Sequence, residues 1–112
     1  KLIVVTASAA QVTVTGHARY APPGQDVVCA AVSALTACLA HALQDLTPDG
    51  QAQYSLKNGD ADIKIAHPTN GTKLLIKAYA LGIMDIAESY QGSVKLVEAL
   101  TTVKQGNVQS NE

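Results

Sequence analysis

The stretch from Gly16 to Ala34, GHARYAPPGQDVVCAAVSA, joins an alternating apolar segment to a long apolar helix and decides how the chain folds. His17 directly follows the alternating segment, and Cys29 lies in what we predict to be the first turn of the helix. Between them, the Pro-Pro-Gly segment at 22–24 excludes both helix and central strand. A histidine and a cysteine are therefore presented from the ends of two regular elements, as a base and its nucleophile would be.

Two strands are predicted before this stretch. Residues 2–6 form an apolar β-branched run, and residues 11–15 alternate valines with polar neighbours, which together indicate a β-hairpin. Gly16 ends the second strand and lets the backbone turn sharply, which sets the direction of His17.

A long helix is predicted to start after Asp26, which is a good N-cap residue, and to run to about Leu46. This start places Cys29 at the third helical position. Apolar residues recur at intervals of three and four, which predicts one buried stripe on the helix. The stripe consists of Val28, Ala31, Val32, Leu35, Leu39, Ala42, Leu43 and Leu46.

The remaining elements repeat this order. Residues 53–57 and 60–66 alternate around an Asn-Gly turn and predict a second hairpin, and residues 72–90 have helical spacing. Residues 94–103 fit either a strand or a short helix, and we favour a strand because it would complete the sheet. The predicted fold is α+β in the order β-β-α-β-β-α-β, with about five mostly antiparallel strands in one sheet and two helices packed on it. We expect one domain over residues 1–104 and a polar tail at 105–112.

Composition excludes several classes of protein. Of the 112 residues, 47% are apolar and 15% are charged, which is typical of a globular domain and not of a disordered chain. A net charge of −1 argues against direct nucleic-acid binding. No apolar run approaches the roughly 18 residues that span a bilayer, and no signal-peptide pattern is present, so we expect a cytoplasmic protein without a membrane partner.

Cys29 is the candidate nucleophile. The thiolate is the attacking species, and the partial positive charge and free N–H groups at a helix start would stabilise it. Those N–H groups would also hold a developing oxyanion, while His17 would take up the thiol proton and later protonate the leaving amine. The alternative is that Cys29 is a packed thiol, since free cysteine is among the most buried residue types, and that His17 caps a turn.

Neighbouring residues have alternative interpretations as well. Asp26 either caps the helix or orients His17 and binds a substrate amide. Ser33 lies one turn after Cys29 and faces the same way, so its hydroxyl bonds either to Cys29 or a substrate, or back to the helix backbone. Cys38 lies among leucines and is predicted to be a packed core thiol.

No metal or cofactor site is expected. His41 and His67 have no cysteine or carboxylate partners at zinc spacing, and no phosphate-binding glycine motif occurs. The two cysteines are about 13.5 Å apart along one helix, too far for a disulfide, which fits a reducing compartment.

Gly16-His17-Ala18, the short Pro/Gly loop and residues 24–34 closely resemble the bacterial ribosomal-processing cysteine proteases known as Prp. The order of elements matches that family over nearly the whole chain. The resemblance implies an endopeptidase that removes the short N-terminal extension of a large-subunit ribosomal protein, number twenty-seven, during ribosome assembly. It also implies a homodimer.

The resemblance further implies roles for single residues. Cys29 would be the nucleophile and His17 the general base and acid, with Asp26, Ser33 and Gly16 in support. A gating loop would contain Ala18, Tyr20, Pro22, Pro23 and Gly24. One alternative function is a non-catalytic, ribosome-associated protein-binding module with a packed Cys29. A thiol redox sensor is the weaker alternative, because no resolving cysteine lies within reach.

Overall fold

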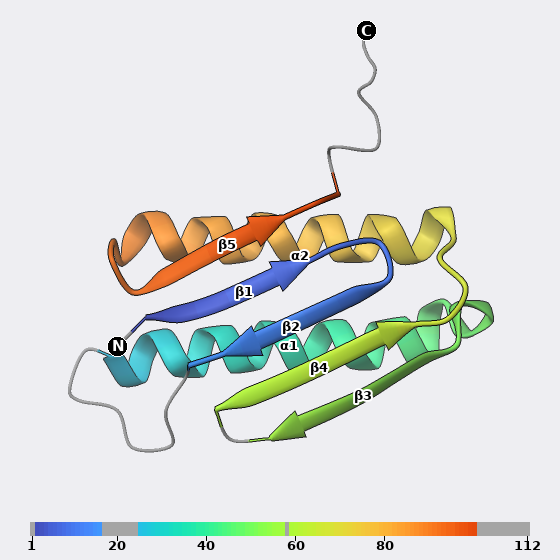
Figure 1. The fold of residues 1–112 in the computed structure, drawn as a ribbon, viewed down its shortest axis with the longest axis horizontal. Helices are drawn as coiled ribbons and strands as arrows, with labels where there is room; N and C mark the ends of the chain where they lie inside the picture. Colours follow the sequence, from blue (N-terminus) through green and yellow to red (C-terminus); the bar gives the residue numbers. More distant parts are fainter. Residues whose placement is uncertain (1, 17–24, 58, 101–112) are drawn as a thin grey trace, which may run out of the picture.

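The computed structural model describes residues 2–16, 25–57 and 59–100, which form one five-stranded sheet with two helices along the same face (Figure 1). The helices run in opposite directions behind the strands in this view. The elements are β1 (Ile3–Ala7), β2 (Gln11–Thr15), α1 (Gln25–Leu46), a 3-10 turn η1 (Pro48–Gly50), β3 (Ala52–Lys57), β4 (Asp60–Ile65), α2 (Asn70–Ser89) and β5 (Val94–Glu98). The predicted α+β class and element order are confirmed, and the ambiguous last segment forms a strand.

The strands lie in the order β3-β4-β2-β1-β5. Three neighbouring pairs are antiparallel, and only β1 and β5 are parallel. That parallel pair follows from α2, which carries the chain back along the sheet before β5 begins, as a parallel connection requires. The sheet is therefore mixed, with the mostly antiparallel pairing that the two hairpins predict.

The core lies between the sheet and the helices. Alternate side chains on the central strands, including Ile3, Val5, Val14 and Ile63, are at most 1% exposed, as expected for strands with one covered face. Each such side chain contributes roughly 1.5–3 kcal/mol by leaving water. On the opposite face of the sheet the described residues form no helix, and polar side chains such as Thr6 are exposed there.

Helix α1 confirms most of the predicted stripe, with two corrections. Leu39 and Leu43 are buried, but Leu46 is 71% exposed because the helix ends there and the chain turns away through η1. Cys38, predicted as a packed core thiol, is exposed. Its leucine neighbours suggested a buried position, yet Cys38 lines an open recess between α1 and α2, beside Leu39 and Tyr79, where solvent reaches it.

Helix α2 begins at Asn70, two residues earlier than predicted, because Thr69 and Thr72 form a reciprocal cap. The Thr72 amide donates to Thr69 Oγ1 at 3.1 Å, and the Thr69 amide donates to Thr72 Oγ1 at 2.8 Å. Such a capping box satisfies two of the N–H groups that a helix start leaves free. Tyr90, predicted within the stripe of this helix, is the C-cap residue and is 43% exposed.

One composition-based expectation needs correction. The segment Val27–Leu46 is long and apolar enough to cross a membrane by length and composition alone. The reason is that Asp45 is the first charged residue after Asp26. One such helix is weak evidence for a membrane span, and here α1 packs Val28, Val32 and Leu43 into the core beneath the sheet.

Candidate active site

The predicted site residues that the structure describes belong to two elements whose ends lie close together. The C-terminal end of β2 and the N-terminal end of α1 lie at the same edge in Figure 1. Gly16 follows that strand, while Asp26, Cys29 and Ser33 lie in the first turns of that helix. His17 lies outside the described residues. So do the proposed gating residues Ala18, Tyr20, Pro22, Pro23 and Gly24.

Gly16 is held in place by contacts with Gly59 and Leu2. Its amide donates to the carbonyl oxygen of Gly59 at 3.2 Å, and its φ is +93°. A Cβ atom added at Gly16 would overlap the carbonyl oxygen of Leu2. Only glycine fits both the close approach and the left-handed backbone. The residue directly before His17 is therefore fixed in place by packing.

Cys29 lies further into its helix than predicted. Because α1 begins at Gln25, Cys29 is the fifth helical residue and not the third, so its own amide lies beyond the four that a helix start leaves free. Its side chain is 7% exposed and belongs to the core cluster with Val28 and Val32. Helical side chains lean toward the N-terminus, so the sulfur lies alongside the first turn of α1.

Asp26 and Ser33 also differ from part of what was expected. Asp26 is the second residue of α1 and not the residue before it, because the helix starts at Gln25. Ser33 is exposed. Within the described part of the chain its hydroxyl makes no hydrogen bond, either to Cys29 or back to the helix backbone. By contrast, Thr36 Oγ1 donates to the carbonyl oxygen of Val32 at 2.7 Å.

A groove that sequence reasoning missed runs beside Ser33. It has a volume of about 500 Å³ and lies between α1 and the β3–β4 hairpin. Buried side chains of Val14, Val32 and Ala61 form its deepest part. Its lining comes from α1 and three strands that are far apart in sequence, so no local pattern marks it. The nearest signal is an alternation of small apolar residues on β2 and β4.

A buried pair of hydroxyls separates this groove from α2. The Thr36 and Tyr79 oxygens are 2.8 Å apart. Because the Thr36 proton goes to Val32, the Tyr79 hydroxyl is the donor in this bond. Burial raises the pKa of Tyr79 to about 12. Both hydroxyls are thus satisfied inside the protein.

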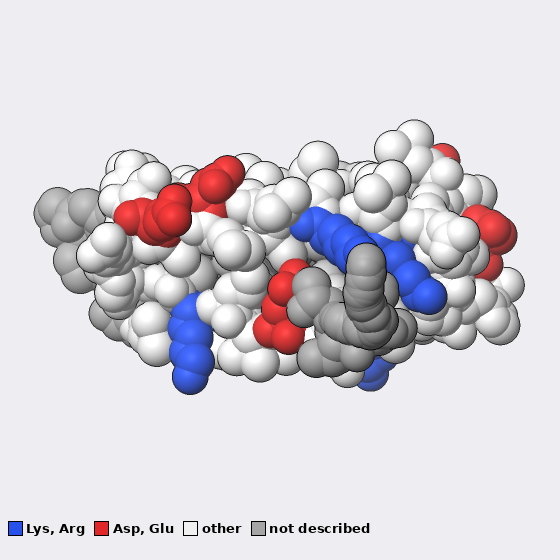
Figure 2. Space-filling model, turned by 90° about the horizontal axis from the view of Figure 1, so that it is seen from above, with Lys and Arg blue, Asp and Glu red and all other residues white. Residues whose placement is uncertain are grey.

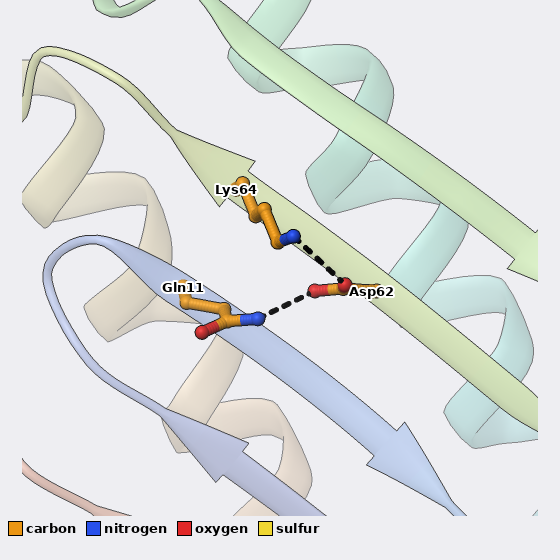
Figure 3. Close-up of polar contacts among 3 residues, drawn as sticks. All are labelled: Gln11, Asp62 and Lys64. Carbon is orange, nitrogen blue, oxygen red and sulfur yellow. Dashed lines mark hydrogen bonds and ion pairs between the residues drawn. The ribbon is translucent and has the colours of Figure 1, made fainter.

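The uncovered face of the sheet carries a second group of polar contacts (Figure 3). Gln11 Nε2 donates to Asp62 Oδ1 at 2.8 Å, and Lys64 Nζ lies 3.8 Å from Asp62 Oδ2. These side chains are on adjacent strands and partly exposed, so they form a solvated strand face. Among the described residues, no three His, Cys, Asp or Glu side chains come together as a metal site would require.

Comparison with known proteins identifies the family. The family model of the cysteine protease Prp matches the chain over residues 3–95. The chain belongs to the Prp family of cysteine proteases. Among curated proteins, none matches this chain significantly.

Solved structures share the Prp-family fold. SMU.848 from Streptococcus mutans is 30% identical with a TM-score of 0.73, and the match covers 89% of this chain and 96% of that chain. The ribosomal processing protease Prp from S. aureus with a substrate peptide is 19% identical, with a TM-score of 0.70 and coverage of 88% and 98%. The same protease with a covalently linked product peptide is 22% identical, with a TM-score of 0.71 and the same coverage.

Proposed function

We propose that this Prp-family protease removes the short N-terminal extension of large-subunit ribosomal protein number twenty-seven during ribosome assembly. The S. aureus family member is described as a ribosomal processing protease and binds a substrate peptide. The observation that carries the proposal is the position of Cys29 near the start of α1. The start of α1 lies at the same end of the molecule as the end of β2, which comes two residues before His17. We infer that the protease domain spans residues 1–104.

The proposed reaction uses Cys29 and His17 as a pair. The His17 imidazole takes the thiol proton, and Cys29 Sγ attacks the carbonyl carbon of the scissile peptide bond. When the tetrahedral intermediate collapses, the C–N bond breaks and the leaving amine takes the proton from His17. Water, deprotonated by His17, then attacks the thioester carbonyl and releases the carboxylate product, with the proton returning to Cys29. This hydrolysis needs no metal or cofactor.

The surroundings of Cys29 suggest how the substrate is held. Ser33 is exposed one turn further along α1, and Asp26 belongs to the first turn of this helix. We propose that both position a peptide near Cys29. We propose that Gly16 sets the backbone before His17, and that residues 18–24 gate the site. An extended substrate would also find free backbone groups on β3, which is an edge strand.

Partners and compartment follow from the same proposal. Large apolar side chains on the outer surfaces of the helices, such as Val27, Leu74 and Leu81, are more than half exposed, which supports a homodimer. Acidic and basic side chains both occur on the face shown in Figure 2, and neither covers it continuously, which supports a protein that does not bind nucleic acid directly. Ribosome assembly places the protein in the cytoplasm.

One observation favours the non-catalytic alternative. The Cys29 side chain is only 7% exposed and packs with core residues, as a structural thiol would. The alternative is a ribosome-associated binding module in which peptide binds but is not cut.

The deciding experiment is mass analysis of the extended ribosomal protein after incubation with the wild-type protein, Cys29→Ala and His17→Ala. We expect the wild type to yield two products whose masses sum to the substrate plus one water, and both variants to leave the substrate intact. A ribosomal protein made without its extension is the control and should stay unchanged. Binding without cleavage by the wild type would favour the non-catalytic module instead.

A further inference from the structure

One buried hydrogen bond joins the middle of α1 to α2. The Tyr79 hydroxyl donates to Thr36 Oγ1 over 2.8 Å, and both side chains are 4% exposed. Among the described residues, no other hydrogen bond and no ion pair joins α1 to the other helix or to the sheet. Burial of apolar surface has no preferred direction, whereas a hydrogen bond has one. This bond therefore specifies how α1 is set against α2.

A close packing contact lies at the same level of the two helices. Leu35 directly precedes Thr36 on α1. On α2, Gly82 follows Tyr79 by three residues, which is about one helical turn. A Cβ atom added at Gly82 would meet Leu35 Cδ1 at 2.9 Å, so the two helices approach each other closely where the hydroxyl bond forms. A shift of α1 would stretch the hydrogen bond or press Leu35 against Gly82.

Thr36 and Cys29 lie on the same side of α1. The seven residues between their positions correspond to about 10 Å along the helix axis and only about 20° around it. Val32 lies between them on this side and is fully buried, and its carbonyl oxygen accepts from Thr36 Oγ1 at 2.7 Å. A rotation of α1 about its axis therefore carries the Thr36 hydroxyl and the Cys29 thiol through the same angle.

Small rotations of α1 matter for the chemistry at Cys29. Side-chain atoms lie about 5 Å from the axis of a helix, so a rotation of about 10° displaces Cys29 Sγ by about 1 Å. A displacement of about 1 Å in a reacting group can lower a rate about 100-fold. A contact that holds α1 within a few degrees therefore bears directly on the rate at which Cys29 Sγ attacks a peptide bond.

We propose that Tyr79 and Thr36 are positioning residues for Cys29. Their hydrogen bond fixes the rotation of α1 and, through the helix, the direction in which the thiol points. Neither side chain is a catalytic residue, because both act through the helix and not on the reacting atoms. The part of this inference that concerns the rate of cleavage rests on the proposed function.

The kinetic test is Tyr79→Phe, which removes the donor and keeps the ring. We expect kcat for the extension peptide to fall at least about tenfold. Tyr90→Phe is the matched control, because Tyr90 is exposed at the end of α2 and its hydroxyl makes no hydrogen bond to the described part of the chain. It should stay within about twofold of wild type, and Thr36→Ser, which keeps a hydroxyl, within about threefold. A kcat within about twofold of wild type in Tyr79→Phe overturns the proposal.

A double variant separates positioning from a purely structural role. Thr36→Val alone leaves the buried Tyr79 hydroxyl without its acceptor, so the midpoint of urea unfolding should fall. Adding Tyr79→Phe removes that unpaired hydroxyl, so the urea midpoint should recover toward wild type. We expect kcat of the double variant to stay at least about tenfold below wild type, because no directional contact is restored. Recovery of kcat together with the urea midpoint would show a purely structural role and overturn the proposal.

A measurement without substrate separates this proposal from the proposed function. The protein is labelled with ¹³C at Cys29 Cβ, and its NMR signal is compared between wild type and the variants. We expect the Cys29 signal to move in Tyr79→Phe and in the double variant, and to stay in place in Tyr90→Phe. Movement of the signal, with no cleavage of the extension by the wild type, would refute the ribosomal substrate and leave the positioning role. An unmoved Cys29 signal would refute the positioning role, whether or not the extension is cleaved.

Discussion

The two cysteines of α1 differ in a way that their sequence contexts do not suggest. Cys29, near the helix start, is 7% exposed and packed in the core, whereas Cys38, in the middle of the helix, is exposed. The sequence suggested that Cys38 was the packed one, because leucines surround it. In this helix the more exposed cysteine is therefore not the one proposed to react. The accessible thiol lies away from the end of β2, and the proposed nucleophile is the sheltered one.

Replacing each cysteine in turn gives the largest expected difference between the two regions. We expect Cys29→Ala to lower kcat/KM for the extension peptide by at least about 1,000-fold, because no other group supplies the nucleophile. Cys38→Ala is the matched control and should stay within about twofold of wild type, since its side chain is far from the proposed chemistry. A similar loss in both variants would remove the functional distinction between the cysteines.

The fixed backbone beside the start of α1 gives the next largest effect. Gly16→Ala is expected to lower the free energy of unfolding by about 3 kcal/mol, because a Cβ there meets the Leu2 carbonyl and strains a φ of +93°. Gly92 has a φ of +84° with open space around it, so Gly92→Ala should cost only about 1 kcal/mol. Urea denaturation of both variants measures the difference. Equal losses would show that the close approach adds nothing to the cost of the backbone angle.

The pH dependence of stability tests the contact between Thr36, in the middle of α1, and Tyr79 of α2. Its pKa is about 12 in the folded protein against about 10 in the unfolded chain. Below pH 10 the Tyr79 hydroxyl is protonated in both the folded and the unfolded state, so its contribution to stability is complete. Between pH 10 and 12 only the unfolded chain loses this proton, so the free energy of unfolding falls as the pH rises. The loss is on the order of 2 kcal/mol and should be absent in Tyr79→Phe. Denaturant titration at each pH measures the decline in the free energy of unfolding. An identical decline in Tyr79→Phe would assign the pH dependence to other titratable groups.

The smallest expected effect is in thiol labelling. In the native protein, iodoacetamide should modify Cys38 at least about tenfold faster than Cys29, because only exposed thiolates react. The two single variants, Cys29→Ala and Cys38→Ala, report each rate separately by mass spectrometry. The extension peptide should slow labelling of Cys29 and leave Cys38 unchanged. Protection of Cys38 alone would place the peptide at the recess between α1 and α2.

Most of the fold was predictable because it depends on local patterns. Period-two alternation marked β2 with the observed bounds, and three- and four-residue spacing marked both helices. The start of α2 was missed because helical spacing marks apolar positions, and the cap formed by Thr69 and Thr72 precedes the first of these. The start of α1 was missed because Asp26 suits an N-cap and also tolerates the first helical turn.

The candidate site was only partly predictable. The sequence marked Cys29, His17, Asp26 and Ser33 through their spacing and their resemblance to a protease family. It did not show the groove beside Ser33, since the walls of that groove come from α1 and from strands that meet only in the folded sheet.

By itself, the sequence determined the order of strands and helices, the family, and the glycine that must precede His17, because periodicity, turn chemistry and motif spacing act between near neighbours. Only the tertiary structure decided that Cys29 is sheltered, that Cys38 is exposed and that a groove opens beside Ser33. The physical reason is that burial depends on which surfaces pack together across the sheet. The apolar stripe shows which side of a helix is buried, and the elements that pack against that side decide how far each residue is covered.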